Sequence, residues 1–282
     1  SNFLWNMRYL LKTNHKILIA KIISKFLTIF ISKNQNVNRN GIKWNLDLNE
    51  GIDLSLYLFG SFEDKITNLK KILPKKDKPL TFIDIGANIG SVSLVMAKMF
   101  DDLKIFAIEP TNYAFRKLSH NLNLNEELKK KVYLRQLFIS NHKKPKSVWS
   151  SWNFEKSNEK HLKHSGTLKE IKQDSFLKLD EFIKEEKLKD IDFIKLDVDG
   201  YELDVLNSGR EFFKNNRPII FIEIAPYLYP EFGYTVFELI NFMKKFNYDF
   251  FDEDLRRIPN IEKHVENIKD GSDRNFFLIH RT

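Results

Sequence analysis

Cysteine is absent from the 282-residue chain. This absence excludes structural disulfides, zinc sites built from cysteine and a cysteine nucleophile. Because nothing then requires an oxidising compartment, a cytoplasmic location is expected. The length suits one large domain or a domain with an extension, and a hydrophobic content of 42% is sufficient for a packed core.

An apolar run long enough to span a bilayer is also lacking. The apolar stretch that begins at Ile17 and ends at Ile31 is too short and contains two lysines. We expect it to form an amphipathic helix whose polar face consists of Lys21, Ser24, Lys25, Thr28 and Ser32. Its apolar face could lie on the inner face of a membrane, but we favour packing against the main domain or contact with a second copy in a homodimer.

Acidic residues are fewer than basic ones, and the net charge is +8. An anionic partner such as nucleic acid, a phosphorylated sugar or a membrane surface would explain this excess. The lysines are scattered along the chain and opposed by nearby acids, which favours a solvated, lysine-rich surface instead.

The chain is organised around residues 80–90, which have the sequence LTFIDIGANIG. The first half is a short apolar run that ends at a glycine, which predicts a buried strand. The second half turns through Gly86 into an expected helix over residues 89–100. A strand, a glycine turn and a helix form the first half of a βαβ unit.

The glycine spacing in this turn separates two classes of cofactor. A dinucleotide-binding turn needs the pattern G-x-G-x-x-G, but Asn88 and Ser91 stand at its second and third glycine positions. The Asp84 carboxylate, just ahead of Gly86, would repel a pyrophosphate and favours a cationic ligand. Glu109, about 20 residues further on at the end of the next expected strand, is positioned to bind ribose hydroxyls.

Alternating strands and helices predict an α/β fold with a doubly wound, mostly parallel sheet. The expected strands are residues 80–85, 104–108, 132–139, 191–196, 218–224, 248–251 and 275–280. No helix is expected between the last two strands, so they should pair antiparallel at one edge of the sheet. We expect residues 1–73 to form an extension with the amphipathic helix and a small α/β cap, and residues 74–282 to form the main domain.

The polar, irregular segment of residues 140–173 is expected to form a hairpin or loop over the active-site face. Trp149 and Trp152 would either stack on a sugar or base, or anchor this segment to the domain. His161 and His164 have the spacing of a metal pair, but we favour solvated loop residues.

Several of these elements together resemble the FkbM-type, S-adenosylmethionine-dependent methyltransferases of class I. They are DIGANIG at residues 84–90, IEP at 108–110, IKLDVDGYE at 194–202 and the acid Glu223 in the expected fifth strand. The sequence LFGSFE at residues 58–63 is similar to the family's N-terminal element. The resemblance implies a seven-stranded Rossmann-like fold and O-methylation of sugar or natural-product hydroxyls. Gln136 and Phe138 depart from the family pattern where the adenine pocket is expected.

The resemblance and the strand ends together give the candidate site residues. Those expected to bind the cofactor are Glu63, Asp84, Gly86, Asn88, Gly90, Glu109, Phe138 and Asp197. Those expected to act in catalysis are Asp197, Glu223, Asp199 and Glu202, with Lys195 as an orienting cation. These acids would take the proton of an acceptor hydroxyl, because ligands sit at the carboxyl ends of the strands in such sheets.

A divalent metal is the alternative use of two of these acids. Asp197 and Glu223 end adjacent expected strands and could share Mg²⁺, which prefers oxygen ligands. Acids at strand ends also accept hydrogen bonds from loop N–H groups, so we expect no metal. Asp199 and Glu202 could likewise cap the helix that follows them.

A small-molecule or glycan acceptor is the leading expectation, and two alternatives stay open. Nucleic-acid methylation is disfavoured because DVDG at residues 197–200 lacks the Asp/Asn-Pro-Pro-aromatic element of amino-methylating enzymes, and no cysteine can attack a cytosine. Methylation of an RNA ribose is not excluded by this pattern. The second alternative is a non-catalytic, membrane-associated scaffold that keeps the fold.

Overall fold

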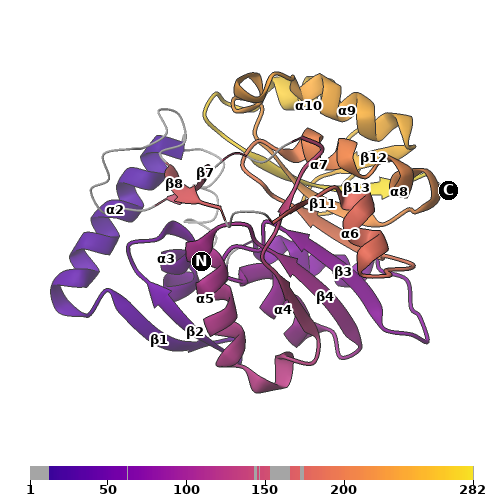
Figure 1. Ribbon diagram of the computed structural model, residues 1–282. Helices are drawn as coiled ribbons and strands as arrows, with labels where there is room; N and C mark the ends of the chain where they lie inside the picture. Colours follow the sequence, from indigo (N-terminus) through magenta and orange to yellow (C-terminus); the bar gives the residue numbers. More distant parts are fainter. Residues whose placement is uncertain are drawn as a thin grey trace.

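A computed structural model of the chain describes residues 13–61, 63–142, 145, 147–152, 166–171 and 175–281. Its centre is a seven-stranded sheet (Figure 1) in the order β12 (Tyr248–Phe251), β13 (Arg274–His280), β11 (Ile219–Ile224), β10 (Phe193–Leu196), β3 (Leu80–Ile85), β4 (Leu103–Ile108) and β5 (Val132–Arg135). The pairs from β11 to β5 are parallel. This confirms the α/β, doubly wound, mostly parallel Rossmann-like sheet.

The last two strands pair antiparallel, as predicted. β13 is also antiparallel to β11, so the reversed strand lies one position inside the edge. The prediction of no helix between these strands is wrong, because α10 (Ile261–Glu266) lies there. This short helix buries only Ile261 and Val265, too few apolar residues to produce a visible helical period.

Both faces of the sheet are covered by helices (Figure 1). One face carries α4 (Ser91–Met99) and α5 (Asn112–Asn123), with the short turn η2 (Glu126–Leu128) between α5 and β5. The other face carries α6 (Leu179–Glu185), α7 (Glu202–Ser208), α8 (Arg210–Asn215), the turn η3 (Tyr229–Phe232), α9 (Val236–Lys245) and α10. Because both faces are buried, the central strands are nearly continuous apolar runs.

An N-terminal segment extends the layer that covers the α4 face. It consists of α2 (Thr13–Phe30), the antiparallel pair β1 (Asn34–Arg39) and β2 (Ile42–Asp47), α3 (Gly51–Phe59) and the 3₁₀ helix η1 (Asp64–Lys71). Alternate side chains of β2, including Trp44, are buried in the same apolar cluster as α4 and β3. The segment therefore shares its core with the main sheet.

Helix α2 packs against α3 through one of its faces. Ala20, Leu27 and Ile31 contact the buried Leu48 and Leu54. None of the helices in the described part of the chain combines the length and the apolarity needed to cross a bilayer.

The polar face predicted for α2 is wrong at one position. Ser24 is fully buried and donates a hydrogen bond to Asn49 Oδ1 at 3.1 Å. This polar residue therefore faces the domain rather than water.

The predicted third strand is too long. β5 ends at Arg135, which pairs with Ile108, the last residue of β4. Beyond this point β4 has no further residue with which β5 could pair. It turns away instead, and β6 (Phe138–Ile139) pairs with β9 (Phe176–Leu177) in a separate two-stranded sheet.

The hairpin expected within residues 140–173 is present as β7 (Ser147–Trp152) and β8 (Gly166–Glu170). A bridge between Thr111 and Ile171 joins the chain beyond β8 to the segment that follows β4. His161, His164 and the side chains of Trp149 and Trp152 lie outside the described residues.

Candidate active site

The turn between β3 and α4 is held tightly against the end of β10. Gly86 has φ +85°, and a Cβ at this position would lie 1.8 Å from the backbone oxygen of Asp197. Glycine is therefore required here by backbone contact with the neighbouring strand end. Asn88, at φ 49°, and Gly90, at φ 91°, continue the turn into α4.

The N–H groups of this turn form hydrogen bonds within the protein. Those of Gly86 and Ala87 donate to the Ile108 carbonyl at 3.0 and 2.9 Å, and that of Gly90 donates to the Ala87 carbonyl at 2.9 Å. The Asn88 N–H donates to Glu109 Oε2 at 3.0 Å. These groups are not available as donors to a pyrophosphate, the ligand against which the glycine spacing and the Asp84 carboxylate also argue.

Glu109 ends β4 and is almost completely buried. Its Oε2 accepts the Asn88 N–H, while Oε1 accepts the Thr111 N–H at 2.9 Å and the Thr111 hydroxyl at 2.6 Å. Burial raises the pKa of Glu109, and these hydrogen bonds counteract the rise. A carboxylate has about four acceptor positions, so Oε2 keeps one for a hydroxyl of a ligand.

A buried ion network lies behind the turn. Asp84 on β3 pairs in register with Lys195 on β10, and the Lys195 Nζ lies 3.7 Å from Asp84 Oδ1. The same Nζ donates to the Gly86 carbonyl at 3.0 Å and to Asp197 Oδ2 at 3.1 Å. Ser93 donates its hydroxyl to Asp84 Oδ2 at 2.6 Å. Lys195 thus connects the turn after β3 to the end of β10.

The charges in this network are mutually dependent. Burial raises the pKa of Asp84, whereas Lys195 and the Ser93 hydroxyl lower it. Burial by itself would lower the pKa of Lys195, but Asp197, Glu63 and Asp84 together raise it above its ordinary value. The Lys195 ammonium is therefore charged even though only 5% of its side chain is exposed.

A second group of acids lies at the carboxyl ends of β10 and β11. Burial raises the pKa of Glu223 well above its ordinary value, and Asp197, Asp273 and Asp199 raise it further. Burial likewise raises the pKa of Asp199, with contributions from Asp197 and Glu202. Within the described residues, the Asp199 and Glu223 side chains accept no hydrogen bond. These two carboxyl groups therefore bind a proton more tightly than ordinary carboxyl groups do.

A sequence model of the FkbM methyltransferase domain matches residues 84–250, which is more than half of the chain. The chain belongs to the FkbM methyltransferase family. The family is one of S-adenosylmethionine-dependent methyltransferases. The match contains the glycine turn, Glu109 and the acids of β10 and β11. A search among curated proteins found none that matches the chain.

Solved methyltransferase structures resemble this FkbM-family chain at low sequence identity. Methyltransferase FkbM from Methylobacillus flagellatus KT is 15% identical, with a TM-score of 0.46 over 74% of this chain and 45% of its own. A human methyltransferase 10 domain containing protein is 12% identical, with a TM-score of 0.46 over 94% and 96%. M. jannaschii TYW2, solved in complex with AdoMet, is 15% identical, with a TM-score of 0.41 over 88% and 85%. The chain spans just under half the length of the Methylobacillus protein.

Glu202, a predicted catalytic residue of this FkbM-family chain, supports the loop that carries Asp199. Its Oε1 accepts the N–H groups of Val198 at 3.1 Å and Gly200 at 3.3 Å, and burial raises the pKa of Glu202 to about 7. A Cβ at Gly200 would lie 2.2 Å from the Phe232 ring, so this loop is also packed tightly. Glu202 is therefore positioned to hold the loop rather than to contact an acceptor.

The other predicted residues divide into two locations. Glu63 is buried, and its charge raises the pKa of both Lys195 and Glu223, so it approaches the acidic group from the N-terminal segment. Phe138 lies in β6, where its ring centroid is 5.1 Å from that of Tyr201. Phe138 therefore contributes to an aromatic wall beside the Asp199 loop.

Several site residues were not predicted from the sequence. Ser93 and Thr111 support Asp84 and Glu109, and their proximity in sequence could have identified them. Burial, together with the charges of Asp273 and Glu223, raises the pKa of Tyr227. Tyr227 and Asp273 therefore both lie beside the acidic group. Asp273 precedes β13, and its proximity depends on the long-range pairing of β13 with β11, which no local pattern reveals.

The arrangement of acids does not favour a divalent metal. Among the described residues, no group of three or more histidine and acidic side chains is arranged to hold a metal ion. Asp197 is also engaged by the Lys195 ammonium, which would compete with a cation for the same oxygen. No step is therefore assigned to a metal at Asp197 and Glu223.

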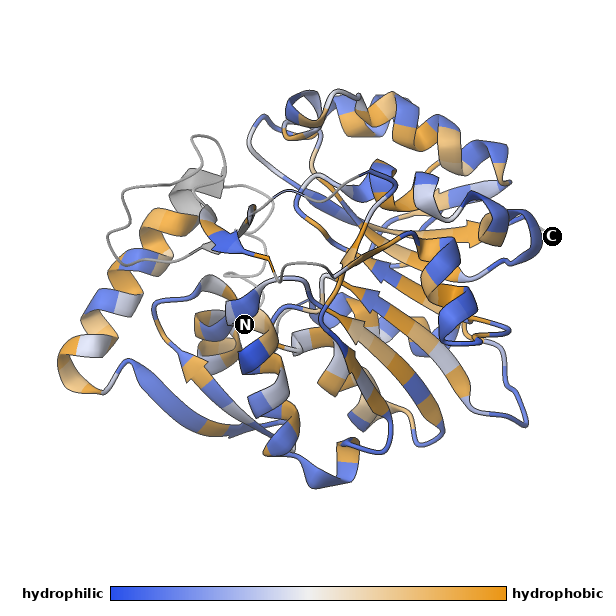
Figure 2. Cartoon of the chain, in the orientation of Figure 1, coloured by the Kyte–Doolittle hydropathy of each residue, from blue (hydrophilic) through white to orange (hydrophobic). Residues whose placement is uncertain are grey.

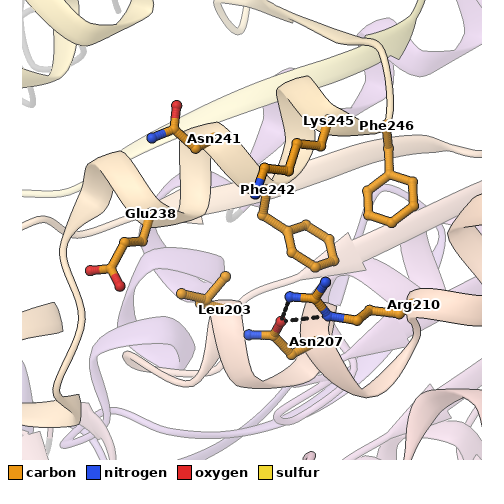
Figure 3. A pocket seen from close by; sticks show the side chains of 8 residues that line it. All are labelled: Leu203, Asn207, Arg210, Glu238, Asn241, Phe242, Lys245 and Phe246. Carbon is orange, nitrogen blue, oxygen red and sulfur yellow. Dashed lines mark hydrogen bonds between the residues drawn. The ribbon is translucent and has the colours of Figure 1, made fainter.

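A separate hollow of about 360 Å³ lies between α7, α8 and α9 (Figure 3). Arg210 lies within it, donating two hydrogen bonds to Asn207 Oδ1 at 3.0 and 2.6 Å, with its guanidinium carbon 5.0 Å from the Phe242 ring centroid. The hollow belongs to the helical layer and contains none of the predicted site residues.

Proposed function

We propose that this FkbM-family protein is an O-methyltransferase that uses S-adenosylmethionine to methylate a hydroxyl of a sugar, glycan or natural product. The observation that supports this most strongly is the group of Asp199 and Glu223. Both carboxyl groups have a pKa raised well above the ordinary value, and both lie at strand ends where this fold class binds its ligands.

The residues around the glycine turn fit S-adenosylmethionine. Glu109 keeps an acceptor position for a ribose hydroxyl, and the surrounding carboxylates suit a cofactor that carries an ammonium and a sulfonium. When bound, the cofactor supplies a methyl group that is already activated by the sulfonium. Lys195 fixes the turn by bonding the Gly86 carbonyl.

The task of the acidic group is to take the proton of the acceptor hydroxyl. A carboxylate whose pKa is raised toward the working pH is a stronger base than an ordinary one and still exists in its ionised form. We assign this role to Glu223. Asp199 and Asp273 strengthen it, because their charges raise the pKa of Glu223.

The test is transfer of a labelled methyl group from S-adenosylmethionine to a panel of oligosaccharides, lipid-linked sugars and RNA. A methyl ether on a sugar hydroxyl resists mild alkali, whereas a methyl ester is hydrolysed. Replacement of the base in Glu223→Gln should lower kcat by about 10²–10⁴-fold while the Kd for the cofactor stays unchanged.

The matched control is Glu211→Gln, which removes an exposed acid on α8 and should leave kcat unchanged. An alkali-labile product would contradict O-methylation of a hydroxyl. Labelling of RNA alone would favour the ribose methyltransferase alternative.

A further inference from the structure

Helix α2 has two different faces. The inward face packs on the domain through Ala20, Leu27 and Ile31, and Ser24 anchors it to Asn49. Its position against the domain is therefore determined by specific contacts. Figure 1 shows α2 at one side of the molecule and α9 and α10 at the opposite side.

The outward face of α2 is apolar and exposed. Figure 2 shows that much of α2 consists of hydrophobic residues. The exposed fractions are 56% for Leu18, 60% for Ile22, 62% for Phe26, 74% for Ile29 and 72% for Phe30. These residues recur at helical spacing, so they form one continuous surface. Single exposed apolar residues are normal, but a continuous set marks a surface that another body covers.

The excess positive charge of the chain lies in its first 46 residues, which include this helix. The whole chain has 46 basic and 38 acidic residues, and Asp47 is its first acidic residue. Eight basic residues precede Asp47, so the remainder of the chain has 38 of each kind and is neutral overall. The excess of basic over acidic residues is therefore not scattered along the chain. The expectation that basic residues are opposed by nearby acids throughout the chain is wrong for the first 46 residues.

We propose that the exposed face of α2 docks the protein on an anionic lipid bilayer. The helix would lie in the plane of the interface, with Ile22, Phe26 and Ile29 at the acyl boundary and Lys21 and Lys25 among the headgroups. The inference is independent of the proposed methyl transfer, because it rests only on exposure and charge.

The charge also argues against the other occupants of this face. A second copy would bring the same basic segment against itself, and like charges would repel. A nucleic acid would satisfy the lysines but leave the apolar surface exposed to water. An anionic bilayer satisfies both features at once.

A chain of contacts links α2 to the candidate site. α3 contacts both α2 and the β7 strand of the hairpin, and the chain beyond β8 is bridged to Thr111 at the carboxyl end of β4. Docking through α2 would therefore bring the hairpin side of the molecule toward the membrane.

The experiment is co-sedimentation of the full chain with vesicles of phosphatidylcholine alone or mixed with phosphatidylserine. We expect binding to the mixed vesicles that weakens as salt is raised. The double variant Phe26→Ser with Ile29→Ser should weaken binding by about 100-fold. Lys25→Glu should weaken it by about tenfold.

Two matched controls distinguish docking through α2 from nonspecific adsorption to the vesicles. Tyr133→Ser with Phe237→Ser removes two exposed aromatic side chains on β5 and α9, and Lys263→Glu reverses an exposed charge on α10. Both controls should bind as the unaltered chain does. The α2 variants should keep the thermal unfolding midpoint, because the altered side chains are exposed.

Three results would overturn the proposal. One is absence of binding to either vesicle by the folded protein. Another is binding that survives in the α2 double variant. The third is a dimer, or a complex with RNA, that is lost in this variant while vesicles are not bound.

Discussion

The carboxyl edge of the sheet contains two groups of acids that differ in their partners. Next to β3 and β4, Asp84 accepts the Ser93 hydroxyl and Glu109 accepts three donors. Next to β10 and β11, Asp199 and Glu223 have other acids as neighbours. We propose that the same residue type serves two purposes: the partnered carboxylates bind a ligand, whereas the crowded carboxylates, whose pKa values are raised, accept a proton.

The largest expected effect on stability comes from disrupting the contact between the Gly86 turn, which belongs to the first group, and the end of β10, which belongs to the second. Gly86→Ala would place a methyl group 1.8 Å from the Asp197 backbone oxygen. We expect a loss of more than about 5 kcal/mol in the free energy of unfolding, measured with urea. Gly233→Ala is the control, because Gly233 also has a positive φ but no atom within 4 Å of the added group, and it should cost only about 1 kcal/mol. Equal losses would show that the turn is not held against β10.

The next largest effect on stability should come from removing the Lys195 ammonium, which lies between the two groups. Lys195→Met leaves Asp84 and Asp197 without their counter-charge, which should cost about 3–5 kcal/mol at pH 7. The deficit should shrink at acid pH, because burial raises the pKa of Asp84 and this carboxyl then protonates. Lys244→Met, which breaks a half-exposed pair with Glu262, should cost less than about 1 kcal/mol. Equal costs would contradict a buried network.

The pH dependence of stability sharpens the comparison further. The pKa of Glu202 is about 7 in the folded protein and lies above its unfolded value, so its contribution is fully present at acid pH and is lost as pH rises through 7. Relative to Glu202→Gln, the unaltered protein should lose roughly 1–3 kcal/mol between pH 4.5 and 8. Urea unfolding of both proteins across this range measures the difference. Parallel pH curves would show that Glu202 is not the titrating group.

The smallest expected effect concerns the acidic limb of the plot of kcat against pH. Asp273 raises the pKa of Glu223, so Asp273→Asn should lower that pKa and move the limb toward lower pH by about half a pH unit. Asp270→Asn, an exposed acid in the same connection, should leave the limb in place. A limb that does not respond to Asp273→Asn would exclude Glu223 as the base that it reports.

Local patterns predicted the fold well because the central strands are apolar runs that end at polar residues. The run before Gly86 and the acids that follow it predicted the turn, the cofactor class and the family. Registers between distant strands could not be predicted, so the pairing of Lys195 with Asp84 and the approach of Asp273 to Glu223 emerged only from the structure. The third strand was predicted too long because its end depends on where β4 stops, which its own sequence does not encode. The roles assigned to the site residues stay predictions.

The most direct measurement is calorimetric binding of S-adenosylmethionine to the unaltered protein, Glu109→Gln and Glu223→Gln, with NAD as the control ligand. The account predicts binding to the unaltered protein that is about tenfold weaker in Glu109→Gln and unchanged in Glu223→Gln. Equal weakening in both variants would contradict the division of the edge into a ligand-binding group and a proton-accepting group. Absence of binding to the folded protein would contradict the methyltransferase function and favour a scaffold.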